Sequence, residues 1–213
     1  MNFLAKLSVR WRTLGASGSL LVFPRAILGG LDPIQMLNDP PNDEISAQRL
    51  LGLPPIVSGN TRLLVLGSFP GAASLARQQY YAHPQNHFWK ILQAIWPASP
   101  LEISVDSYEK RSNWLLDRGL GVWDVYASCE REGSLDAAIR QAEVNDFASL
   151  IRRCPQLRGV AHNGGESFRH AKFTATLGLP VYKLPSTSPA NASWSFERKL
   201  TAWREVVAAA GLL

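Results

Sequence analysis

The sequence of 213 residues lacks the features that mark metal-binding, disulfide-rich and membrane-spanning proteins. Its two cysteines, Cys129 and Cys154, are too few for a disulfide scaffold and do not form a C-x-x-C pair, so we expect neither a structural zinc nor an iron–sulfur cluster. No apolar run approaches the roughly 18 residues of a membrane-spanning helix, and no segment repeats at a fixed period. These absences exclude membrane spans and solenoids and predict a protein without metal or cofactor.

What is present suffices for one ordinary folded domain. Apolar residues make up 46% of the chain, including seven Trp and eight Phe, which is enough for a full core. The net charge of +5 is unevenly distributed, because residues 151–213 carry nine Lys and Arg against three Glu. That basic third could face a polyanion such as DNA, although charge alone is equally compatible with a solvated basic surface.

The N-terminal segment differs from the rest of the chain. We predict an N-terminal extension at 1–49 and a folded domain at 50–213. The first thirty residues contain basic but no acidic side chains, which is compatible with a transit-type presequence, a wrongly chosen start codon or a flexible arm. Proline and arginine interrupt the apolar run that a secretory signal would need. We therefore expect a cytoplasmic protein, associated with the nucleoid if bacterial, rather than organellar targeting by residues 1–30.

Alternating short apolar runs and helical patterns follow the extension. Strands are expected at 62–66, 120–123, 157–161 and 180–184. Helices are expected at 72–79, 87–96, 106–116, 145–151 with Asn145 as cap, 164–173 and 193–210. This order predicts an α/β fold, a three-layer αβα sandwich around a mostly parallel four-stranded sheet. Ligands of such sheets bind beyond the carboxyl ends of the strands, and the distinctive motifs all lie there.

Two of these strand ends carry chemistry of their own. Gly67 to Gly71 (GSFPG) joins a strand to a helix, so that its backbone N–H groups can approach a ligand; it has neither the lysine of a P-loop nor dinucleotide-binding spacing. In the aromatic-rich segment 79–89, Tyr81 could stack on a planar ligand. Asn86 could position a water or simply cap the helix that follows it, where Phe88 is expected in the core.

Four motifs in this order resemble the uracil-DNA glycosylase superfamily. They are GSFPG, YYAHPQNHFW, NGG and LPSTSPAN, and the resemblance covers the chain from Leu50 to the C-terminus. It is greatest to the hypoxanthine-DNA (deoxyinosine) glycosylase branch, which is related to the mismatch-specific uracil and thymine glycosylases. The resemblance implies a monomeric, monofunctional enzyme of base excision repair. Such an enzyme flips a deaminated base out of DNA, with hypoxanthine first and uracil second, and hydrolyses its N-glycosidic bond without metal or cofactor.

Carried over to this chain, the resemblance places Ser68 beside the sugar and the attacking water. The relatives have a water-positioning Asp or Asn at the third position of this loop, where this chain has Phe69. Phenylalanine can neither activate water nor stabilise a cationic sugar, so Asn86 is the expected substitute. His83 is the best-placed general acid or cation stabiliser.

The resemblance also implies residues that bind the base. Tyr81 would stack on it, beside Phe69. Asp124 would accept an N–H of the base as a carboxylate, the alternative being a solvated strand cap. Asn163 would support the pocket more than it takes part in catalysis.

The last motif is the expected DNA contact. Its small hydroxyl residues can bind phosphates while its tip enters the duplex, although a plain Ser/Pro turn is the alternative. The residues are Pro185, Ser186, Thr187, Ser188, Pro189 and Asn191.

Two other functions stay open at this point. Phe69 favours a catalytically weak DNA-binding member of the same fold, and a hydrolase of free nucleosides would not need the basic C-terminal third. The site as the sequence presents it is poor in carboxylates, so the expected mechanism relies on a good leaving group and preorganised hydrogen bonds.

Overall fold

The computed structural model describes residues 49–102 and 107–213. Of the predicted extension 1–49, only Arg49 belongs to the described residues, and Asp106 of the predicted third helix also lies outside them. Within the described part, no helix combines the length and the apolar character needed to cross a bilayer.

The centre of the fold is a four-stranded sheet with the order β3-β2-β6-β7, in which every neighbouring pair is parallel. Its strands are β2 (Leu63–Gly67), β3 (Leu120–Asp124), β6 (Gly159–Asn163) and β7 (Val181–Leu184). β2 and β6 are buried along their whole length, as expected of central strands covered on both faces. The α/β fold class and the predicted strands are confirmed, with boundaries that differ by one or two residues.

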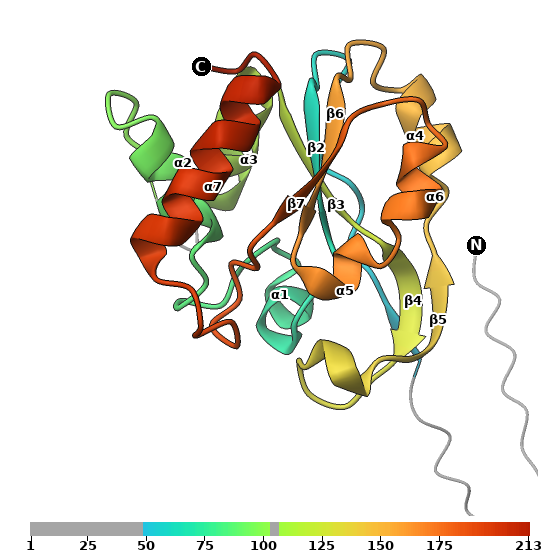
Figure 1. Ribbon diagram of the computed structural model, residues 1–213. Coiled ribbons are helices and arrows are strands. Elements are labelled where there is room, and N and C mark those ends of the chain that lie inside the picture. The colour runs from blue at the N-terminus through green and yellow to red at the C-terminus, as the bar shows by residue number, and fades with distance from the viewer. Residues whose placement is uncertain (1–48, 103–106) are drawn as a thin grey trace, which may run out of the picture. The chain divides into compact units, whose positions relative to one another are not determined.

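Helices cover both faces of this sheet (Figure 1). On one side lie α2 (Phe88–Ile95), α3 (Tyr108–Asp117) and α7 (Phe196–Ala209); α4 (Phe147–Arg152) and α6 (Ala171–Ala175) lie on the other, and α1 (Ala72–Arg77) and α5 (Gly165–Phe168) follow strand ends. Phe88 of α2 meets Trp203 of α7 edge to face, with ring centroids 5.7 Å apart. Both rings are buried, and truncating one such ring typically costs about 3–5 kcal/mol.

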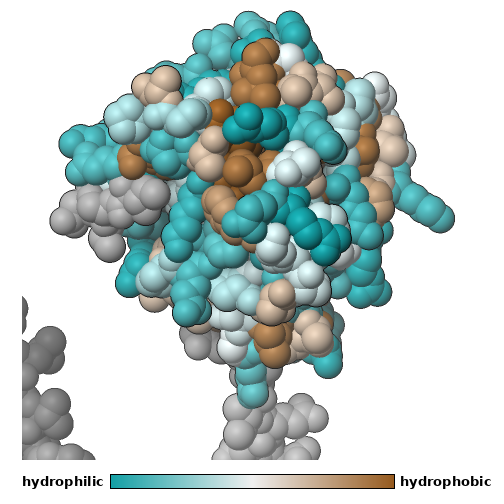
Figure 2. Space-filling view, turned by 60° about the vertical axis from the view of Figure 1, so that its left-hand side comes forward, coloured by the Kyte–Doolittle hydropathy of each residue, from teal (hydrophilic) through white to brown (hydrophobic). Residues whose placement is uncertain are grey.

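The outer surface over α2, α3 and α7 is mostly hydrophilic, with separate apolar patches between the polar side chains (Figure 2). This division is what amphipathic helices produce when their apolar stripes face a sheet. The strongest example is α2, whose buried residues include Phe88, Ile91 and Leu92.

A second sheet was not predicted from the sequence. It is antiparallel with the order β1-β4-β5 and consists of β1 (Arg49–Leu51), β4 (Tyr126–Glu130) and β5 (Arg140–Val144). β1 has only three residues, and every residue of β5 is exposed, so neither shows an apolar run. The connection between β4 and β5, residues 131–139, returns to the end of the central sheet beside the GSFPG loop.

Several predicted helix boundaries were wrong, and side-chain caps decide two of them. Asp146 rather than Asn145 caps α4, its Oδ1 accepting from the Ser149 N–H at 2.9 Å. The helix predicted from residue 193 begins at Phe196, where Ser195 is the cap. The helix predicted over 164–173 is two short helices, α5 and α6, both hydrogen-bonded to the buried ring of His162.

Candidate active site

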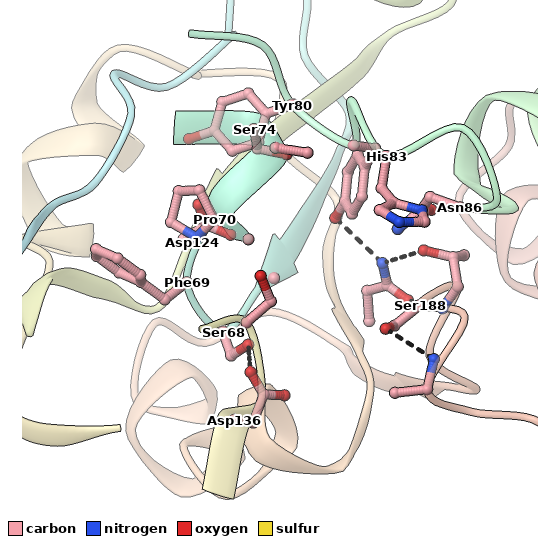
Figure 3. Close-up of a pocket in the computed structure, with 18 of the residues that line it drawn as sticks. Ser68, Phe69, Pro70, Ser74, Tyr80, His83, Asn86, Asp124, Asp136 and Ser188 are labelled. Atoms are coloured by element: carbon pink, nitrogen blue, oxygen red, sulfur yellow. Dashed lines mark hydrogen bonds between the residues drawn. The ribbon is translucent and has the colours of Figure 1, made fainter. Parts of the chain in front are cut away.

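A pocket of about 440 Å³ lies at the carboxyl ends of the central strands, as the sequence predicts (Figure 3). All four sequence motifs contribute residues to its lining, and so does the segment 131–139, which was not predicted to take part. The predicted site residues that line it are Ser68, Phe69, Tyr81, His83, Asn86, Asp124, Asn163, Thr187, Ser188 and Pro189. Pro185, Ser186 and Asn191 do not line it.

The GSFPG loop leaves β2 without room for a side chain at its first position. A Cβ atom on Gly67 would clash with Asp124 Oδ1. Any other residue there would therefore force the buried carboxyl group to move. The next residue, Ser68, donates its hydroxyl proton to Asp136 Oδ1 at 2.6 Å. The loop thus brings two carboxyl groups from distant segments to the same place.

Phe69 lies at the edge of the pocket with its ring turned into the core. It is 5% exposed and packs in the cluster that covers the β4 side of the central sheet. The Arg131 guanidinium lies over the ring, 5.0 Å from its centroid. In Figure 3 the ring lies far from His83 and Asn86. The geometry therefore favours a structural role for Phe69 over the predicted contact with the base.

Tyr81 is held in a fixed orientation by two neighbours. Its ring stacks on Phe88 with centroids 3.9 Å apart, and its hydroxyl accepts from Asn163 Nδ2 at 3.1 Å. Its backbone is left-handed (φ 54°), a conformation that costs a non-glycine residue about 1–3 kcal/mol. Burial, aided by the nearby Asp124, raises the pKa of Tyr81, so the hydroxyl stays neutral. With one ring face covered by Phe88, only the other can stack on a ligand.

Asn86 and His83 lie together on one wall (Figure 3). Asn86 Oδ1 accepts from the Phe88 N–H at 2.9 Å, so the capping role that the sequence left open is present. A carbonyl oxygen has a second lone pair and the amide nitrogen two protons, so this bond leaves groups for a water. His83 Nδ1 accepts from the Gln85 N–H at 3.2 Å, which leaves Nε2 for other partners.

Asn163 uses most of its hydrogen-bonding groups within the protein. Its Nδ2 donates to Tyr81 and to Thr187 Oγ1, and its Oδ1 accepts from the Thr187 N–H at 3.0 Å. The side chain therefore joins the end of β6 to Tyr81 and to the last motif. This arrangement is what the predicted supporting role requires.

Asp124 is a buried acid in the pocket with a strongly raised pKa. It is 4% exposed, and its Oδ2 is buried with no hydrogen-bond partner among the described residues. Burial first, and then the charge of Asp136, raises the pKa of Asp124 to about 8, against a smaller opposing effect of Arg131. A group with this pKa is mostly protonated at neutral pH. The alternative of a solvated cap was wrong because the side chain is buried, and the raised pKa favours the neutral acid over the predicted carboxylate.

The sequence analysis missed Asp136 altogether. It belongs to the connection between β4 and β5, in a stretch without regular hydrophobic spacing, and lines the pocket beside Ser68. Burial raises its pKa while the hydrogen bond from Ser68 opposes that rise. The only signal in the sequence was an acidic residue in a polar stretch, and that is common. With Asp124 and Asp136 both present, the site is not poor in carboxyl groups.

The last motif is fastened to the protein at several points. Thr187 accepts the His87 N–H through its backbone carbonyl at 3.0 Å. Asn191 donates from Nδ2 to the Ser186 carbonyl at 3.0 Å and accepts from Lys199 Nζ at 2.9 Å through its own carbonyl. The segment 185–191 is consequently a shaped loop and not a loose turn.

Comparison with known proteins decides the family. Residues 54–207 match the model of the uracil DNA glycosylase superfamily. The chain belongs to this superfamily. It is 35% identical over 155 residues to a hypoxanthine DNA glycosylase of Methanosarcina acetivorans, which covers 73% of this chain and 96% of that protein. A hypoxanthine DNA glycosylase of Methanosarcina barkeri is also 35% identical, over 154 residues, 72% of this chain and 95% of that protein.

Two further relatives extend the comparison. A G/U mismatch-specific uracil DNA glycosylase of Schizosaccharomyces pombe is 28% identical over 109 residues, 51% of this chain and 32% of that protein. A solution NMR structure of a Methanosarcina acetivorans protein, provisionally described as a uracil DNA glycosylase, superposes with a TM-score of 0.67 at 33% identity. It covers 77% of this chain and 99% of that one.

The described part of this uracil DNA glycosylase superfamily member shows no cluster of metal-ligating side chains. In residues 49–102 and 107–213, no group of three or more His, Cys, Asp or Glu side chains could hold a metal ion. His162, one of the four histidines, is buried between Ser167 and Thr174, and burial lowers its pKa to about 4. It is a neutral structural residue.

Proposed function

We propose that this protein is a monofunctional DNA glycosylase that hydrolyses the N-glycosidic bond of deaminated bases in DNA, hypoxanthine first and uracil second. Membership of the superfamily and two relatives named hypoxanthine DNA glycosylase support the reaction and the base. The observation that carries the proposal is the pocket, where the buried Oδ2 of Asp124 has no hydrogen-bond partner in the described part of the chain and lies among the converging loops. Buried polar groups are nearly always hydrogen-bonded, so this one is available for a ligand.

A neutral Asp124 suits the edge of a deaminated base. A carboxylic acid presents an O–H donor next to a carbonyl acceptor. Hypoxanthine presents N1–H beside O6, and uracil N3–H beside O4, so that either base can form two hydrogen bonds with the acid. An ionised Asp124 would accept the N–H but repel the neighbouring carbonyl oxygen. The raised pKa of Asp124 thus favours the protonation state that pairs best.

The free face of Tyr81 can hold the plane of the flipped base. The volume of about 440 Å³ lies within the usual range for small-ligand sites, roughly 300–1,000 Å³. Extruding a nucleotide costs a few kcal/mol and is easiest for a mispaired base. The neutral Asp124 also complements some normal bases. We therefore expect most of the selectivity to come from the weaker pairing of a deaminated base in the duplex.

The remaining residues supply positioning and DNA contact. Asn86 holds a water for addition to the sugar, and its bond to the α2 backbone fixes the amide. The segment 185–191, with the basic side chains that follow it, contacts the phosphates on either side of the flipped nucleotide. Oriented groups of this kind are typically worth about 3–4 kcal/mol each in the transition state.

The decisive test is excision from defined oligonucleotides. The full chain is incubated in EDTA with duplexes that contain one deoxyinosine or one deoxyuridine, and abasic sites are then cleaved with alkali. Strand breaks at the deaminated base are expected, from a monomer that needs neither metal nor iron–sulfur cluster. Retention of DNA without breaks would favour the catalytically weak binding protein, and turnover of free inosine alone would favour a nucleoside hydrolase.

A further inference from the structure

The segment 131–139 forms part of the active pocket, and not merely a connection in the second sheet. Its Ser134 Oγ accepts from the Ala72 N–H at 2.9 Å, and its Asp136 accepts from Ser68 at 2.6 Å. Arg131 at its start donates to the Pro70 carbonyl. Three hydrogen bonds therefore fasten this segment along the GSFPG loop.

The carboxyl group of Asp136 keeps one oxygen for a ligand. Ser68 bonds to Oδ1, and in the described part of the chain no donor reaches Oδ2. Ser68 and Asp136 lie on the opposite side of the pocket from His83 and Asn86 (Figure 3). A nucleotide sugar between these two sides would have an amide on one side and a carboxylate on the other.

The two carboxyl groups of the pocket differ in what surrounds them. Asp124 is almost fully buried and receives no hydrogen bond at Oδ2, whereas Asp136 lies at the rim and is hydrogen-bonded by Ser68. Two acids held in such different surroundings divide into a neutral and an ionised member. Glu166 disfavours the charge on Asp136 and Arg131 favours it, and the two acids disfavour each other's charge. Asp136 is the one that ionises first.

We propose that Asp136 is a catalytic carboxylate of this enzyme, supplying the negative charge that Phe69 cannot. The inference rests on the proposed glycosylase function. As the bond between C1′ and the base nitrogen breaks, its electron pair leaves with the base, which takes up a proton from solvent. The Asp136 carboxylate stabilises the positive charge on the sugar. Water then adds to C1′ and gives its extra proton to Asp136, which releases it to solvent.

The test compares single-turnover excision of hypoxanthine by wild type, Asp136→Asn and Glu132→Gln. Asparagine has the same shape and can still accept from Ser68, so the pocket is retained while the charge is lost. We expect a rate about 100-fold or more below wild type, the usual cost of losing one charge-stabilising group. Glu132 is an exposed acid of the same segment, and its variant should excise at the wild-type rate.

Two further readouts separate catalysis from structure. Binding of Asp136→Asn to the deoxyinosine duplex should stay within about threefold of wild type. The wild-type excision rate should fall at low pH as Asp136 becomes protonated. Because the pKa of Asp136 is raised, this fall should begin at a higher pH than for an ordinary aspartate. The same fall should be absent in Asp136→Asn.

The outcomes are distinguishable. Wild-type activity with an equally active Asp136→Asn variant would overturn the inference and leave the proposed function standing. Parallel loss of rate and binding, or of folding, would also overturn it by assigning Asp136 a structural role. A wild-type protein that cleaves none of the oligonucleotides would contradict the proposed function itself.

Discussion

The two sides of the pocket are built from different chemistry. One side, which we call the amide wall, consists of His83, Asn86, Asn163 and Thr187; the other, the carboxyl wall, consists of Ser68, Asp124 and Asp136. In the amide wall, hydrogen bonds fix Asn86 to the backbone of α2 and Asn163 to Thr187. In the carboxyl wall the groups titrate, and their state depends on burial and on each other. The contribution of the amide wall to excision should therefore depend on the position of its side chains, and that of the carboxyl wall on the protonation state of its two acids.

The largest expected effect tests the amide wall. Asn86→Ala should cut turnover about 100-fold or more with DNA binding preserved, because a positioning group for water is lost. The variant also loses a helix cap, which typically costs about 1 kcal/mol of stability. Single-turnover rates, binding and thermal midpoints are measured together.

A matched control separates these two losses. Asp146→Ala removes the cap of α4, outside the pocket, and should lower the thermal midpoint by a similar amount without changing the rate. Equal rates for Asn86→Ala and wild type would remove Asn86 from the mechanism.

The carboxyl wall should respond to pH. With the neutral form of Asp124 reading the base, excision should fall as pH rises through about 8. Asp124→Asn still presents a donor beside an acceptor but does not titrate, so it should abolish this alkaline limb while excision of both bases stays within about tenfold of wild type. Rates over a pH series on both oligonucleotides measure it. An alkaline limb that persists in Asp124→Asn would mean that Asp124 does not read the base.

Stability gives an independent check on the same group. The folded-state pKa of Asp124 is raised above its unfolded value, so the folded protein binds the proton more tightly. The stability associated with this proton is present below pH 4 and is lost as pH rises toward about 8. The free energy of unfolding should consequently decline less steeply over this range in Asp124→Asn than in wild type. Identical slopes would contradict the raised pKa.

A smaller effect concerns the loop beyond the amide wall. Lys199 is 1% exposed and donates from Nζ to the Asn191 carbonyl. Lys199→Met keeps the apolar stem but loses this bond, and should weaken binding to DNA about fivefold, since one neutral-acceptor bond is typically worth about 1 kcal/mol. Lys172→Met removes the same charge from an exposed site of α6 and should bind nearly as wild type. Equal affinities of the two variants would show that charge alone matters.

The smallest effect on catalysis is expected at Phe69. Since the ring lies in the core, Phe69→Leu should lower stability by about 1–2 kcal/mol while excision stays within about threefold of wild type. Denaturant unfolding and single-turnover rates are the measurements. A large loss of rate in a stable variant would place the ring in contact with the substrate after all.

The parallel sheet was predictable because its signals are local. β2 and β6 are short apolar runs, and α2 has its buried residues at helical spacing, so neighbouring residues determine each element. The antiparallel sheet was not predictable in this way. β5 is polar and exposed, and only its pairing with β4 across the connection 131–139 makes it a strand.

The sequence alone was enough for the α/β class, the order of the strand-end loops and the family motifs, and it predicted that Asn86, Tyr81 and part of the last motif meet in one pocket. The tertiary structure was needed to show that Phe69 faces the core, that Asp136 joins the pocket and that burial raises the pKa of Asp124. The physical reason is that burial and charge coupling depend on which distant segments meet. A carboxyl group at a given position has no fixed pKa until the fold removes its water and places another acid beside it.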